Sequence, residues 1–341
     1  MMVHIAVVIL NWNGRHYLEK FLPGVVKYSS GPGIQVVVAD NGSTDDSVAL
    51  ILQQYPEITI IEFDKNHGYA EGYNKALKLI TARYFVLLNS DVEVTQNWLN
   101  PVIGLMEHDD KIAACMPKIR SFDKREYFEY AGAAGGFIDK FGYPFCRGRI
   151  LNHIEEDTGQ YDSVREIFWA SGACLFIRSE LFLQSGGFDP GFFAHMEEID
   201  LCWRLKNQGY KILYSPDSII YHVGGGTLPN QHPGKIYLNF RNNLFVLYKN
   251  LPVKNFSLIL FARIALDILA AFKFLFTLEI RRFYAVLKAH LKFYTKLGKY
   301  RKIRKRLIKN VKNNNHTEIY RKSILFQLFI LRKKTFKKLC L

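Results

Sequence analysis

Short apolar runs alternate with amphipathic segments along the N-terminal part of the chain. The apolar runs are too short and too rich in β-branched residues for helices, which favours strands. We expect these strands at residues 3–10, 35–39, 59–63 and 84–88, with helices between them at residues 17–29, 46–54 and 72–80. This βαβαβαβ order predicts a Rossmann-like α/β fold, with a mainly parallel central sheet flanked by helices. Ligands of such sheets bind beyond the carboxyl ends of the strands.

The middle of the chain has a less regular pattern. Residues 120–168 are rich in glycine and aromatic residues, and we expect them to form loops and short strands over the site. The remaining elements expected here are a strand at 169–178, a helix at 196–209 that ends at its glycine, and short strands at 211–214 and 219–222. We therefore expect one catalytic domain at residues 1–252, followed by a separate region at 253–341.

The apolar pattern changes again after residue 252. Residues 256–276 have about the length that a membrane-spanning helix needs, roughly 20 residues. Arg263, Asp267 and Lys273 interrupt the segment, and charges in a bilayer are costly. Arg263 and Asp267 are spaced to pair on one helical face. We therefore expect a helix that lies at an interface or packs on a partner, in preference to one that spans.

The basic residues are concentrated at the C-terminal end. Residues 281–341 contain 20 lysines and arginines against one acid, Glu318, whereas the whole chain has a net charge of +15. A block of this kind attracts polyanions, so nucleic acid, an anionic membrane surface and a merely solvated tail are all possible partners or states. Apolar residues are interleaved with the charges, and no nucleic-acid-binding motif is recognised. This favours a basic, amphipathic helical extension that associates with a membrane, and no nucleic acid is expected as partner.

Cysteine usage and the start of the chain bear on the compartment. The five cysteines are widely spaced and form no C-x-x-C pair, which fits a reducing cytoplasm. The chain enters a strand pattern almost at once, without the apolar stretch and cleavage site of a secretion signal. We expect a peripheral protein on the cytoplasmic side of the cell membrane.

Acidic residues follow two of the predicted parallel strands. Asp40 comes directly after an apolar strand, where its carboxylate could accept hydrogen bonds from a base or a ribose, or could simply form a turn. Asp91 closes the triplet Asn89-Ser90-Asp91 after another strand. Divalent cations are commonly held by one or two carboxylates together with substrate phosphates, so Asp91 is a candidate metal ligand. The alternative is a turn acid that caps the next helix.

Two later segments carry further candidates. Glu197, Glu198 and Asp200 stand at the start of a predicted helix, where the helix dipole favours acids and where Asp200 could pair with Arg204. One of these carboxylates could instead be a general base. His222 ends a strand before three consecutive glycines at 224–226, whose backbone could approach a phosphate; this is a weak signal by itself.

Taken together and in this order, these segments resemble the inverting glycosyltransferases of family 2, which have the GT-A fold, especially their bacterial rhamnosyltransferase-like branch. The resemblance covers about residues 3–250. It is carried by Val7-Val8-Ile9-Leu10-Asn11-Trp12-Asn13-Gly14, the Asp40 turn, Asn66-His67-Gly68-Tyr69-Ala70-Glu71-Gly72-Tyr73-Asn74, Leu87-Leu88-Asn89-Ser90-Asp91, Gly186-Gly187-Phe188-Asp189, the acidic cluster and His222.

The resemblance implies roles for individual residues. A nucleotide pocket would be lined by Asn11, Asn13, Asp40, Asn66, Gly68, Asn74, Asn89 and Ser90. Asp91 and His222 would hold Mg²⁺ or Mn²⁺, and Trp169, Gly172 and Arg241 would line the donor and acceptor pocket. The family has an Asp-x-Asp-like triplet where this chain has Asn89 in first place, so the cation would be held by fewer protein charges.

The resemblance also implies a reaction. The family commonly has Glu-Asp in the acidic cluster, with the Asp as base; Glu198 occupies that place here, and Glu197 is the second choice. The reaction would be a metal-assisted, inverting transfer from a nucleotide-diphosphate sugar to a hydroxyl of a lipid-linked saccharide, as in cell-surface polysaccharide or O-antigen synthesis. The branch suggests dTDP-rhamnose as donor, and UDP-sugars remain open. The alternatives are a nucleic-acid-binding protein and a family member that binds nucleotide sugar without turnover.

Overall fold

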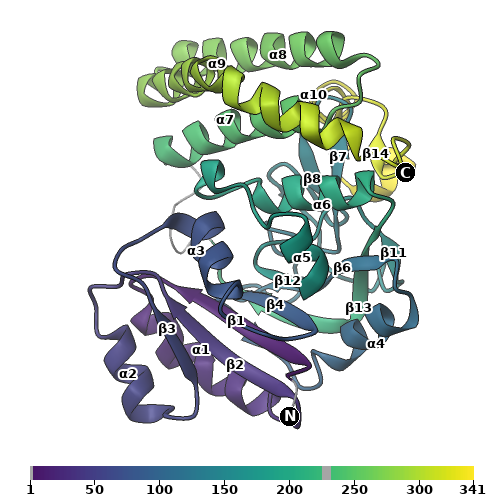
Figure 1. Cartoon of the computed structure of the whole chain (residues 1–341). Helices are drawn as coiled ribbons and strands as arrows, with labels where there is room; N and C mark the ends of the chain where they lie inside the picture. Colours follow the sequence, from purple (N-terminus) through teal and green to yellow (C-terminus); the bar gives the residue numbers. More distant parts are fainter. Residues whose placement is uncertain (1–2, 225–231) are drawn as a thin grey trace.

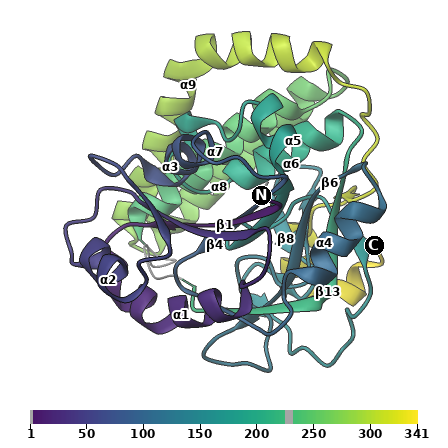
Figure 2. The same ribbon diagram turned by 60° about the horizontal axis from the view of Figure 1, so that its bottom comes forward.

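The N-terminal half is built on four parallel strands. The computed structural model describes residues 3–224 and 232–341. The strands are β1 (Ile5–Asn11), β2 (Ile34–Asp40), β3 (Thr59–Glu62) and β4 (Tyr84–Asn89). They are connected by α1 (Arg15–Tyr28), α2 (Ser47–Gln54) and α3 (Gly68–Leu77). The predicted βαβαβαβ order is confirmed. Helices α1 and α2 lie on one face of these strands and α3 lies on the other (Figures 1 and 2).

The second half of the chain extends the same sheet. Strand β12 (Cys174–Arg178) lies between β4 and β6 (Ile112–Ser121) and is antiparallel to both. Beyond β6 comes β13 (Lys211–His222), with a break in register between Ser215 and Ile219, so the two strands predicted there form one irregular strand. The sheet has nine strands in the order β11-β13-β6-β12-β4-β1-β2-β3, with β5 (Val92–Val94) also paired to β13. Strand β11 is Arg165–Glu166.

A second, small sheet lies beside the first. Its strands are β7 (Gly136–Asp139), β8 (Pro144–Cys146), β9 (Arg149–Ile150), β10 (His153–Ile154) and β14 (Ile319–Tyr320). Four of them come from the segment 120–168, so the loops and short strands predicted there are confirmed. Three further helices are α4 (Asn100–His108), α5 (Ser179–Gln184) and α6 (Glu197–Asn207), and a short 3-10 turn, η1, covers Pro190–Phe192.

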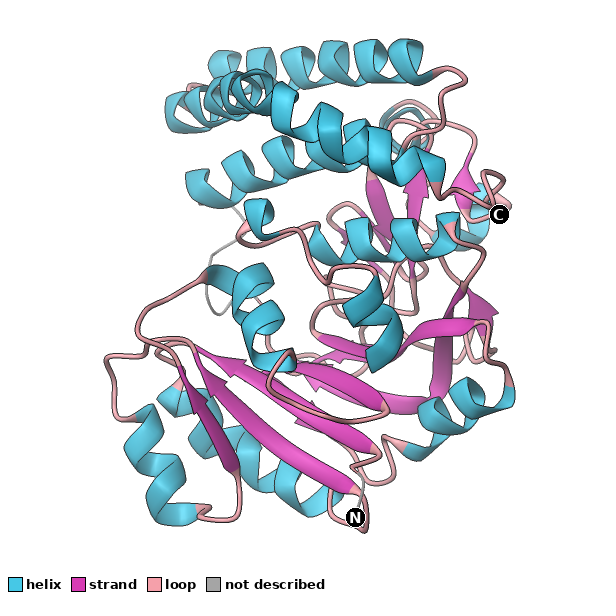
Figure 3. Cartoon of the chain, in the orientation of Figure 1, coloured by secondary structure: helices cyan, strands magenta, loops and turns pink. Residues whose placement is uncertain are grey.

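Long helices form a layer over the rest of the molecule (Figure 3). They are α7 (Pro233–Asn250), α8 (Phe256–Phe276) and α9 (Ile280–Lys309), and the predicted helical extension is therefore present. Within the described ranges, none of the helices is both long enough and apolar enough to cross a membrane.

The chain then returns to the small sheet. Strand β14 pairs with β7, α10 (Ile324–Phe329) follows, and η2 (Phe336–Leu339) brings the ring of Phe336 onto Phe137, 4.9 Å between ring centroids. The last thirty or so residues are therefore packed into the folded body. The division into domains at residue 252 remains a prediction.

Candidate active site

The turn after β2 is built around Asp40. Asp40 is buried; its Oδ2 accepts a hydrogen bond from Asn11 Nδ2 at 3.1 Å and its Oδ1 accepts one from the Ser43 amide at 2.8 Å. Asn13 joins the same turn, because its Oδ1 accepts a hydrogen bond from the Thr44 amide at 2.7 Å. Three of the predicted nucleotide-binding residues therefore form one rigid polar turn at the carboxyl edge of the sheet.

Two more of the predicted residues form the turn before α3. Asn66 Oδ1 accepts hydrogen bonds from Asn41 Nδ2 at 3.1 Å and from the Gly68 amide at 2.7 Å. Gly68 has φ +77°, and a Cβ there would lie 2.5 Å from the ring of Phe193. Any larger residue would be strained and would clash, so the close approach of Phe193 explains this glycine.

Asp91 meets His222 and a third residue that the sequence analysis missed. His222 Nε2 lies 3.1 Å from Asp91 Oδ1, and His222 Nδ1 lies 3.2 Å from Glu129 Oε2. The pairing of β5 with β13 produces this contact, because it places His222 opposite Val92, the residue after Asp91. All three side chains are buried. Glu129 lies in the irregular glycine-rich segment and belongs to no motif, so the sequence carried no signal for it.

The charges of His222 and Asp91 depend on their neighbours in this cluster. Burial acts to lower the pKa of His222, but the carboxylates of Asp91 and Glu129 outweigh it and raise the pKa to about 10. Burial acts to raise the pKa of Asp91, and the charge of His222 outweighs it, so the pKa stays below its ordinary value. The cluster is a buried imidazolium between two carboxylates.

Asn89 and Ser90 complete this edge of the sheet. Asn89 stands opposite Leu10 of β1, and Asp40 stands opposite Asn11, so the two predicted carboxylate positions lie on either side of the end of β1. Asn89 Nδ2 is 3.4 Å from His222 Nε2. A Cβ on Gly14 would lie 3.4 Å from Ser90 Oγ and 2.3 Å from Asn11 Oδ1, which places Ser90 beside the Asp40 turn.

Glu197 and Glu198 are the first two residues of α6, and each has one carboxylate oxygen without a hydrogen-bond partner among the described residues. Glu197 Oε2 and Glu198 Oε2 are both buried, and neither has a hydrogen-bond partner within the described part of the chain. Burial raises the pKa of Glu198 to about 7. Burial and the charge of Glu198 hold the pKa of Glu197 well above its usual range. A carboxylate whose pKa is near neutrality can take up a proton during a reaction, which suits a general base.

A strained loop presents these two acids. Phe193, His195 and Met196 all have positive φ, at +67°, +69° and +73°. Non-glycine residues in this conformation cost free energy and persist only where other contacts hold them. The loop also reaches α3, since the Phe193 carbonyl accepts a hydrogen bond from the Ala70 amide at 3.1 Å.

Helix α7 supplies the contacts that hold the loop. Asn242 Nδ2 donates to the carbonyls of Phe192, Ala194 and His195 at 3.0, 2.8 and 2.7 Å. Arg241 donates to the carbonyls of Gly191 and Phe192 at 3.1 and 2.8 Å. Arg241 therefore supports the loop through its backbone, and a contact with donor or acceptor remains a prediction. Asn242 was not found from the sequence, because an asparagine within a helix has no distinctive pattern.

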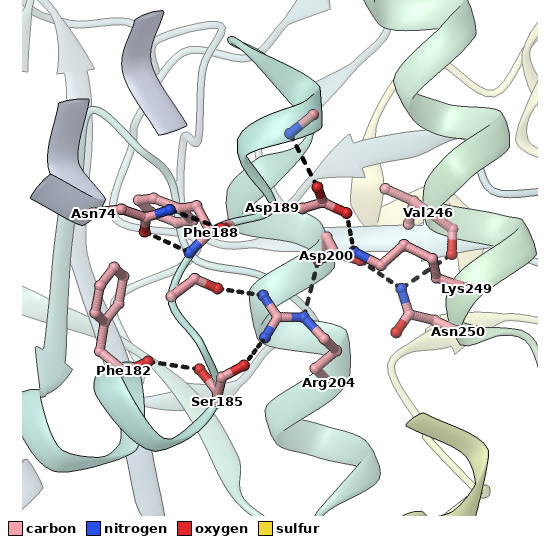
Figure 4. A network of polar contacts seen from close by, with 12 residues as sticks. Asn74, Phe182, Ser185, Phe188, Asp189, Asp200, Arg204, Val246, Lys249 and Asn250 are labelled. Carbon is pink, nitrogen blue, oxygen red and sulfur yellow. Dashed lines mark hydrogen bonds and ion pairs between the residues drawn. The ribbon is translucent and has the colours of Figure 1, made fainter. Parts of the chain in front are cut away.

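A buried network ties α6 to α7 (Figure 4). Asp200 accepts hydrogen bonds from Arg204 Nε at 2.9 Å and from Lys249 Nζ and Asn250 Nδ2, each at 2.8 Å. The predicted pair Asp200–Arg204 is confirmed. Asp189 also binds Lys249, at 2.8 Å. With all these partners Asp200 is structural, and Glu197 and Glu198 are the acids of the cluster left with unpartnered oxygens.

The remaining predicted residues lie around this core. Asn74 binds the amide and carbonyl of Phe188 at 2.9 and 2.8 Å, so it anchors the segment that leads to α6. Trp169 is buried and donates from Nε1 to the Phe137 carbonyl at 2.9 Å. The Gly172 carbonyl accepts a hydrogen bond from Tyr69 OH at 2.6 Å. Ligand contacts of Asn74, Trp169 and Gly172 remain predictions.

Cys146 is a buried thiol beside Arg149, whose guanidinium lies 3.2 Å from its Sγ. Burial raises the pKa of Cys146 and Arg149 acts to lower it, while the charges of Glu129 and Glu198 add smaller increases. Of the glycine run predicted to approach a phosphate, Gly224 has φ +71°, and Gly225 and Gly226 lie outside the described residues.

A divalent cation fits the residues at the Asp91 end in a limited way. Across residues 3–224 and 232–341, no group of three or more His, Cys, Asp or Glu side chains is arranged to enclose a metal ion. Asp91 is nevertheless ionised and stands at the open edge of the sheet beside Asn89 and Ser90. This donor set fits Mg²⁺ or Mn²⁺ that takes most of its ligands from phosphate and water.

Two solved glycosyltransferases share this arrangement of strands and helices. The mannosyltransferase PcManGT from Pyrobaculum calidifontis, in complex with GDP-Man and Mn²⁺, matches 92% of this chain and 87% of its own, with a TM-score of 0.53 at 14% identity. GalNAc-T7 with UDP, GalNAc and Mn²⁺ matches 73% of this chain with a TM-score of 0.56 at 18% identity, and 48% of the GalNAc-T7 chain is covered. The fold is the GT-A fold of glycosyltransferases.

The sequence then gives the family. The profile of glycosyl transferase family 2 matches residues 6–182, more than half of the chain, and the chain belongs to this family. An N-acetylglucosaminyl-diphospho-decaprenol L-rhamnosyltransferase of Mycobacterium tuberculosis (strain ATCC 25618 / H37Rv) is 26% identical over 233 residues, which cover 64% of this chain and 75% of the relative. The rhamnosyltransferase WbbL of Escherichia coli (strain K12) is 24% identical over 220 residues, 62% of this chain and 80% of the relative. The resemblance to the rhamnosyltransferase-like branch is confirmed.

Proposed function

We propose that this family 2 glycosyltransferase moves a sugar from a nucleotide-diphosphate donor to a saccharide hydroxyl, with inversion at the anomeric carbon. The observation that carries the proposal is that two sets of acids, one at the edge of the sheet and one at the start of α6, face one site. Asp40 and Asp91 stand on either side of the end of β1, and the loop that rests on α3 presents Glu198 with an unpartnered oxygen.

The nucleotide binds at the Asp40 turn. Asp40, Asn11 and Asn13 hold a rigid set of polar groups there, and Asn66 with Gly68 forms the next turn along the same edge. A pre-formed polar turn binds a base and ribose without the free-energy cost of ordering a loop. The relatives named rhamnosyltransferases favour dTDP-rhamnose as donor. The solved structures contain GDP-Man or UDP, so UDP-sugars and GDP-sugars are alternative donors.

The diphosphate lies at the Asp91 end of the site. Asp91, with Asn89 and Ser90, would hold the Mg²⁺ or Mn²⁺ that neutralises the leaving diphosphate as a Lewis acid, and His222 would join as a ligand once the cation displaces its Nε2 proton. Glu129 keeps His222 oriented through Nδ1, the arrangement that commonly fixes a ligating imidazole. Two of the solved relatives contain Mn²⁺, which supports a divalent cation here.

Glu198 acts on the acceptor. Its carboxylate takes the proton from the incoming hydroxyl, whose oxygen then bonds to the anomeric carbon on the face opposite the nucleotide as the bond to the diphosphate breaks. Only the ionised carboxylate can do this, and a pKa of about 7 makes both forms accessible near neutral pH.

The acceptor is a lipid-linked saccharide, and the protein works as a peripheral protein at the cytoplasmic side of the membrane. The relative from M. tuberculosis is named for an acceptor that carries a decaprenol chain. A cell-surface polysaccharide is the corresponding product class.

Thermal unfolding with a panel of nucleotide sugars tests the donor half of the proposal. We expect one donor to raise the melting temperature more with Mn²⁺ or Mg²⁺ than without, and the increase to vanish in Asp40→Ala. The donor proposal fails if no nucleotide sugar stabilises the protein under either condition. A donor that binds, but is never consumed with any acceptor tried, would identify a non-catalytic family member.

A further inference from the structure

Helix α8 buries charged side chains and exposes apolar ones. The side chains that it buries are Arg263, Asp267 and Ala271, two of them charged. Arg263 Nε lies 2.8 Å from Asp267 Oδ1, so the pair predicted from the sequence is confirmed. A helix on the surface of a protein in water normally buries its apolar stripe and exposes its charges. The orientation of α8 is the reverse.

The charged face of α8 has matched partners in the body of the protein. Arg263 NH1 donates to Asn243 Oδ1 of α7 at 2.5 Å and its guanidinium lies 4.0 Å from the ring centroid of Tyr143. Asp267 Oδ2 lies 3.2 Å from His290 Nε2 of α9. A buried charge is tolerated only with partners of this kind, so these contacts fix which face of α8 points inward.

The outer face of α8 is a continuous apolar stripe. We call it the α8 stripe; it consists of Leu258, Phe261, Ala265, Leu269, Phe272 and Phe276, spaced by three or four residues. The side chains are strongly exposed, with Phe261 at 71%, Leu269 at 64% and Phe276 at 81%. Single exposed apolar residues are ordinary, but a contiguous stripe over a whole helix marks an interaction surface.

The charges around the stripe indicate what covers it. Lys273 on α8 and Arg281, Lys288, Lys292 and Lys296 on α9 are all exposed, and residues 281–341 carry 20 basic residues against one acid. Helices α8 and α9 contact each other, so the apolar stripe of one helix neighbours the basic residues of the other. This combination is typical of helices that lie in the headgroup region of an anionic bilayer. A partner protein would need both an apolar groove and an acidic rim, whereas an anionic bilayer offers both properties at once.

We propose that the α8 stripe inserts into the surface layer of an anionic phospholipid bilayer, with α8 parallel to the membrane and the basic residues of α9 bound to lipid headgroups. This proposal rests on the proposed function for the choice of a membrane as partner. What it adds is the surface of the protein that contacts the membrane. Figure 1 shows α8 at the outermost edge of the molecule, on the far side of α7 from the central sheet.

The turn between α8 and α9 lies beside the start of α7. Leu278, at 83% exposure, lines a hollow of about 500 Å³ together with residues 279–282 and with Pro233, the first residue of α7. Helix α7 also carries Arg241 and Asn242, which hold the loop before Glu198. Helix α7 therefore connects the membrane-facing turn with the loop that presents Glu198.

Surface substitutions in the full chain test the proposal. Deleting residues 255–341 would remove β14 and Phe336 and expose the aromatic core of the small sheet, so loss of binding would be ambiguous. The test variant is Phe261→Gln with Leu269→Gln and Phe276→Gln. The matched control is Leu52→Gln with Leu79→Gln and Leu183→Gln, which changes three exposed leucines at 62%, 70% and 46% on other surfaces.

Vesicle flotation is the measurement. We expect the native protein to bind vesicles of phosphatidylglycerol and phosphatidylcholine, and to bind pure phosphatidylcholine at least about tenfold more weakly. The stripe variant should lose at least about tenfold in affinity for the anionic vesicles, because exposed apolar area drives insertion, and the control should bind as the native protein does. Equal melting temperatures and equal stabilisation by nucleotide sugar in all three proteins show that the fold and the donor site are intact.

Three results would overturn the proposal. One is a stripe variant that binds anionic vesicles as tightly as the native protein, and another is a control variant that loses as much affinity as the stripe variant. The third is a native protein that ignores vesicles and forms dimers in sedimentation, with the stripe variant monomeric, since the stripe would then cover a second copy of the chain. If no nucleotide sugar binds while vesicle binding follows the expected pattern, the proposed function fails and the membrane surface stands.

Discussion

His222 Nε2 lies 3.1 Å from Asp91 Oδ1, although 131 positions separate the two residues in the chain. The contact depends on the pairing of β5 with β13, and Glu129 holds the other ring nitrogen. Each residue alone has an ordinary structural explanation. Their convergence at the sheet edge that also carries Asp40 is what makes this end of the site suitable for a metal and a diphosphate.

Replacing Asp91 should abolish most of the activity without unfolding the protein. In Asp91→Asn we expect kcat/KM to fall at least about 100-fold, because the cation that neutralises the leaving diphosphate loses its charged ligand. Glu129→Gln, which removes one of the two carboxylates that orient and charge His222, should cost about 10- to 100-fold. Metal titration of initial rates checks both, and chelation by EDTA should reduce the native rate as Asp91→Asn does. Full activity in EDTA would exclude the metal assignment.

Glu198→Gln should lower turnover by about 10²–10⁴-fold, because the variant cannot take the proton from the acceptor. Burial raises the pKa of Glu198 to about 7, so the native kcat should rise with pH through about 7, where half of the carboxylate is ionised, and level off about one pH unit higher. The variant should lack this rise. Kinetics between pH 5.5 and pH 9 measure both effects.

Glu197→Gln is the matched control for that experiment. Glu197 is the neighbouring buried acid, and burial with the charge of Glu198 holds its pKa well above its usual range, so it gives up its proton less readily than an ordinary glutamate. We expect Glu197→Gln to keep both the rate and the pH profile within a few-fold. If Glu197→Gln loses the activity and Glu198→Gln retains it, the base is Glu197.

Asp40→Ala should weaken donor binding about 10- to 100-fold, the range expected when a hydrogen bond to a charged group is removed. The same change also frees Asn11 and the Ser43 amide, so the turn loses its fixed geometry. Titration calorimetry with the nucleoside diphosphate alone measures the loss, since the sugar contacts are then absent. An unchanged affinity would show that the base binds elsewhere.

Asp200→Asn should destabilise the fold by about 3–5 kcal/mol at pH 7, because Lys249 and Arg204 would be left as buried charges with a poorer partner. Glu19→Gln, which breaks the exposed pair with Arg15, should cost less than about 1 kcal/mol. Urea unfolding of the three proteins makes the comparison.

The same network predicts a pH dependence. Burial acts to raise the pKa of Asp200, but Lys249 and Arg204 outweigh it and keep the pKa below its ordinary value. The stabilisation is therefore present above the unfolded pKa of about 4, and is lost as pH falls through the lower folded pKa. The difference in unfolding free energy between native protein and Asp200→Asn should shrink below about pH 4. A difference that stays constant down to acid unfolding would contradict this assignment.

The sequence predicted the parallel half of the fold well. Its strands are short β-branched runs between amphipathic helices, and their ends carry Asp40 and Asp91. Strand β6 was missed because Ile112–Ser121 mixes apolar residues with Pro117 and Lys118 and shows no regular alternation. Strand β14 was missed because two residues carry no pattern, and its pairing with β7 spans more than half the chain.

The sequence predicted the candidate site residues that belong to motifs, and it missed two residues that belong to none. Glu129 and Asn242 act through partners distant in sequence, His222 for Glu129 and the loop before α6 for Asn242, and only the folded chain brings those partners together. Asn74 and Arg241 matched family positions, and the structure engages their polar atoms with backbone groups. The Arg263–Asp267 pair was predicted from spacing, but its inward direction depends on Tyr143, Asn243 and His290.

The anomeric configuration of the product tests the central claim most directly. The purified protein is incubated with Mn²⁺, a lipid-linked saccharide and each of dTDP-rhamnose, UDP-sugars and GDP-mannose, and the new linkage is examined by NMR. We predict transfer from one of these donors, with the configuration at the anomeric carbon opposite to that in the donor, and loss of transfer in Glu198→Gln. A product that retains the donor configuration, formed at an equal rate by Glu198→Gln, would contradict the account.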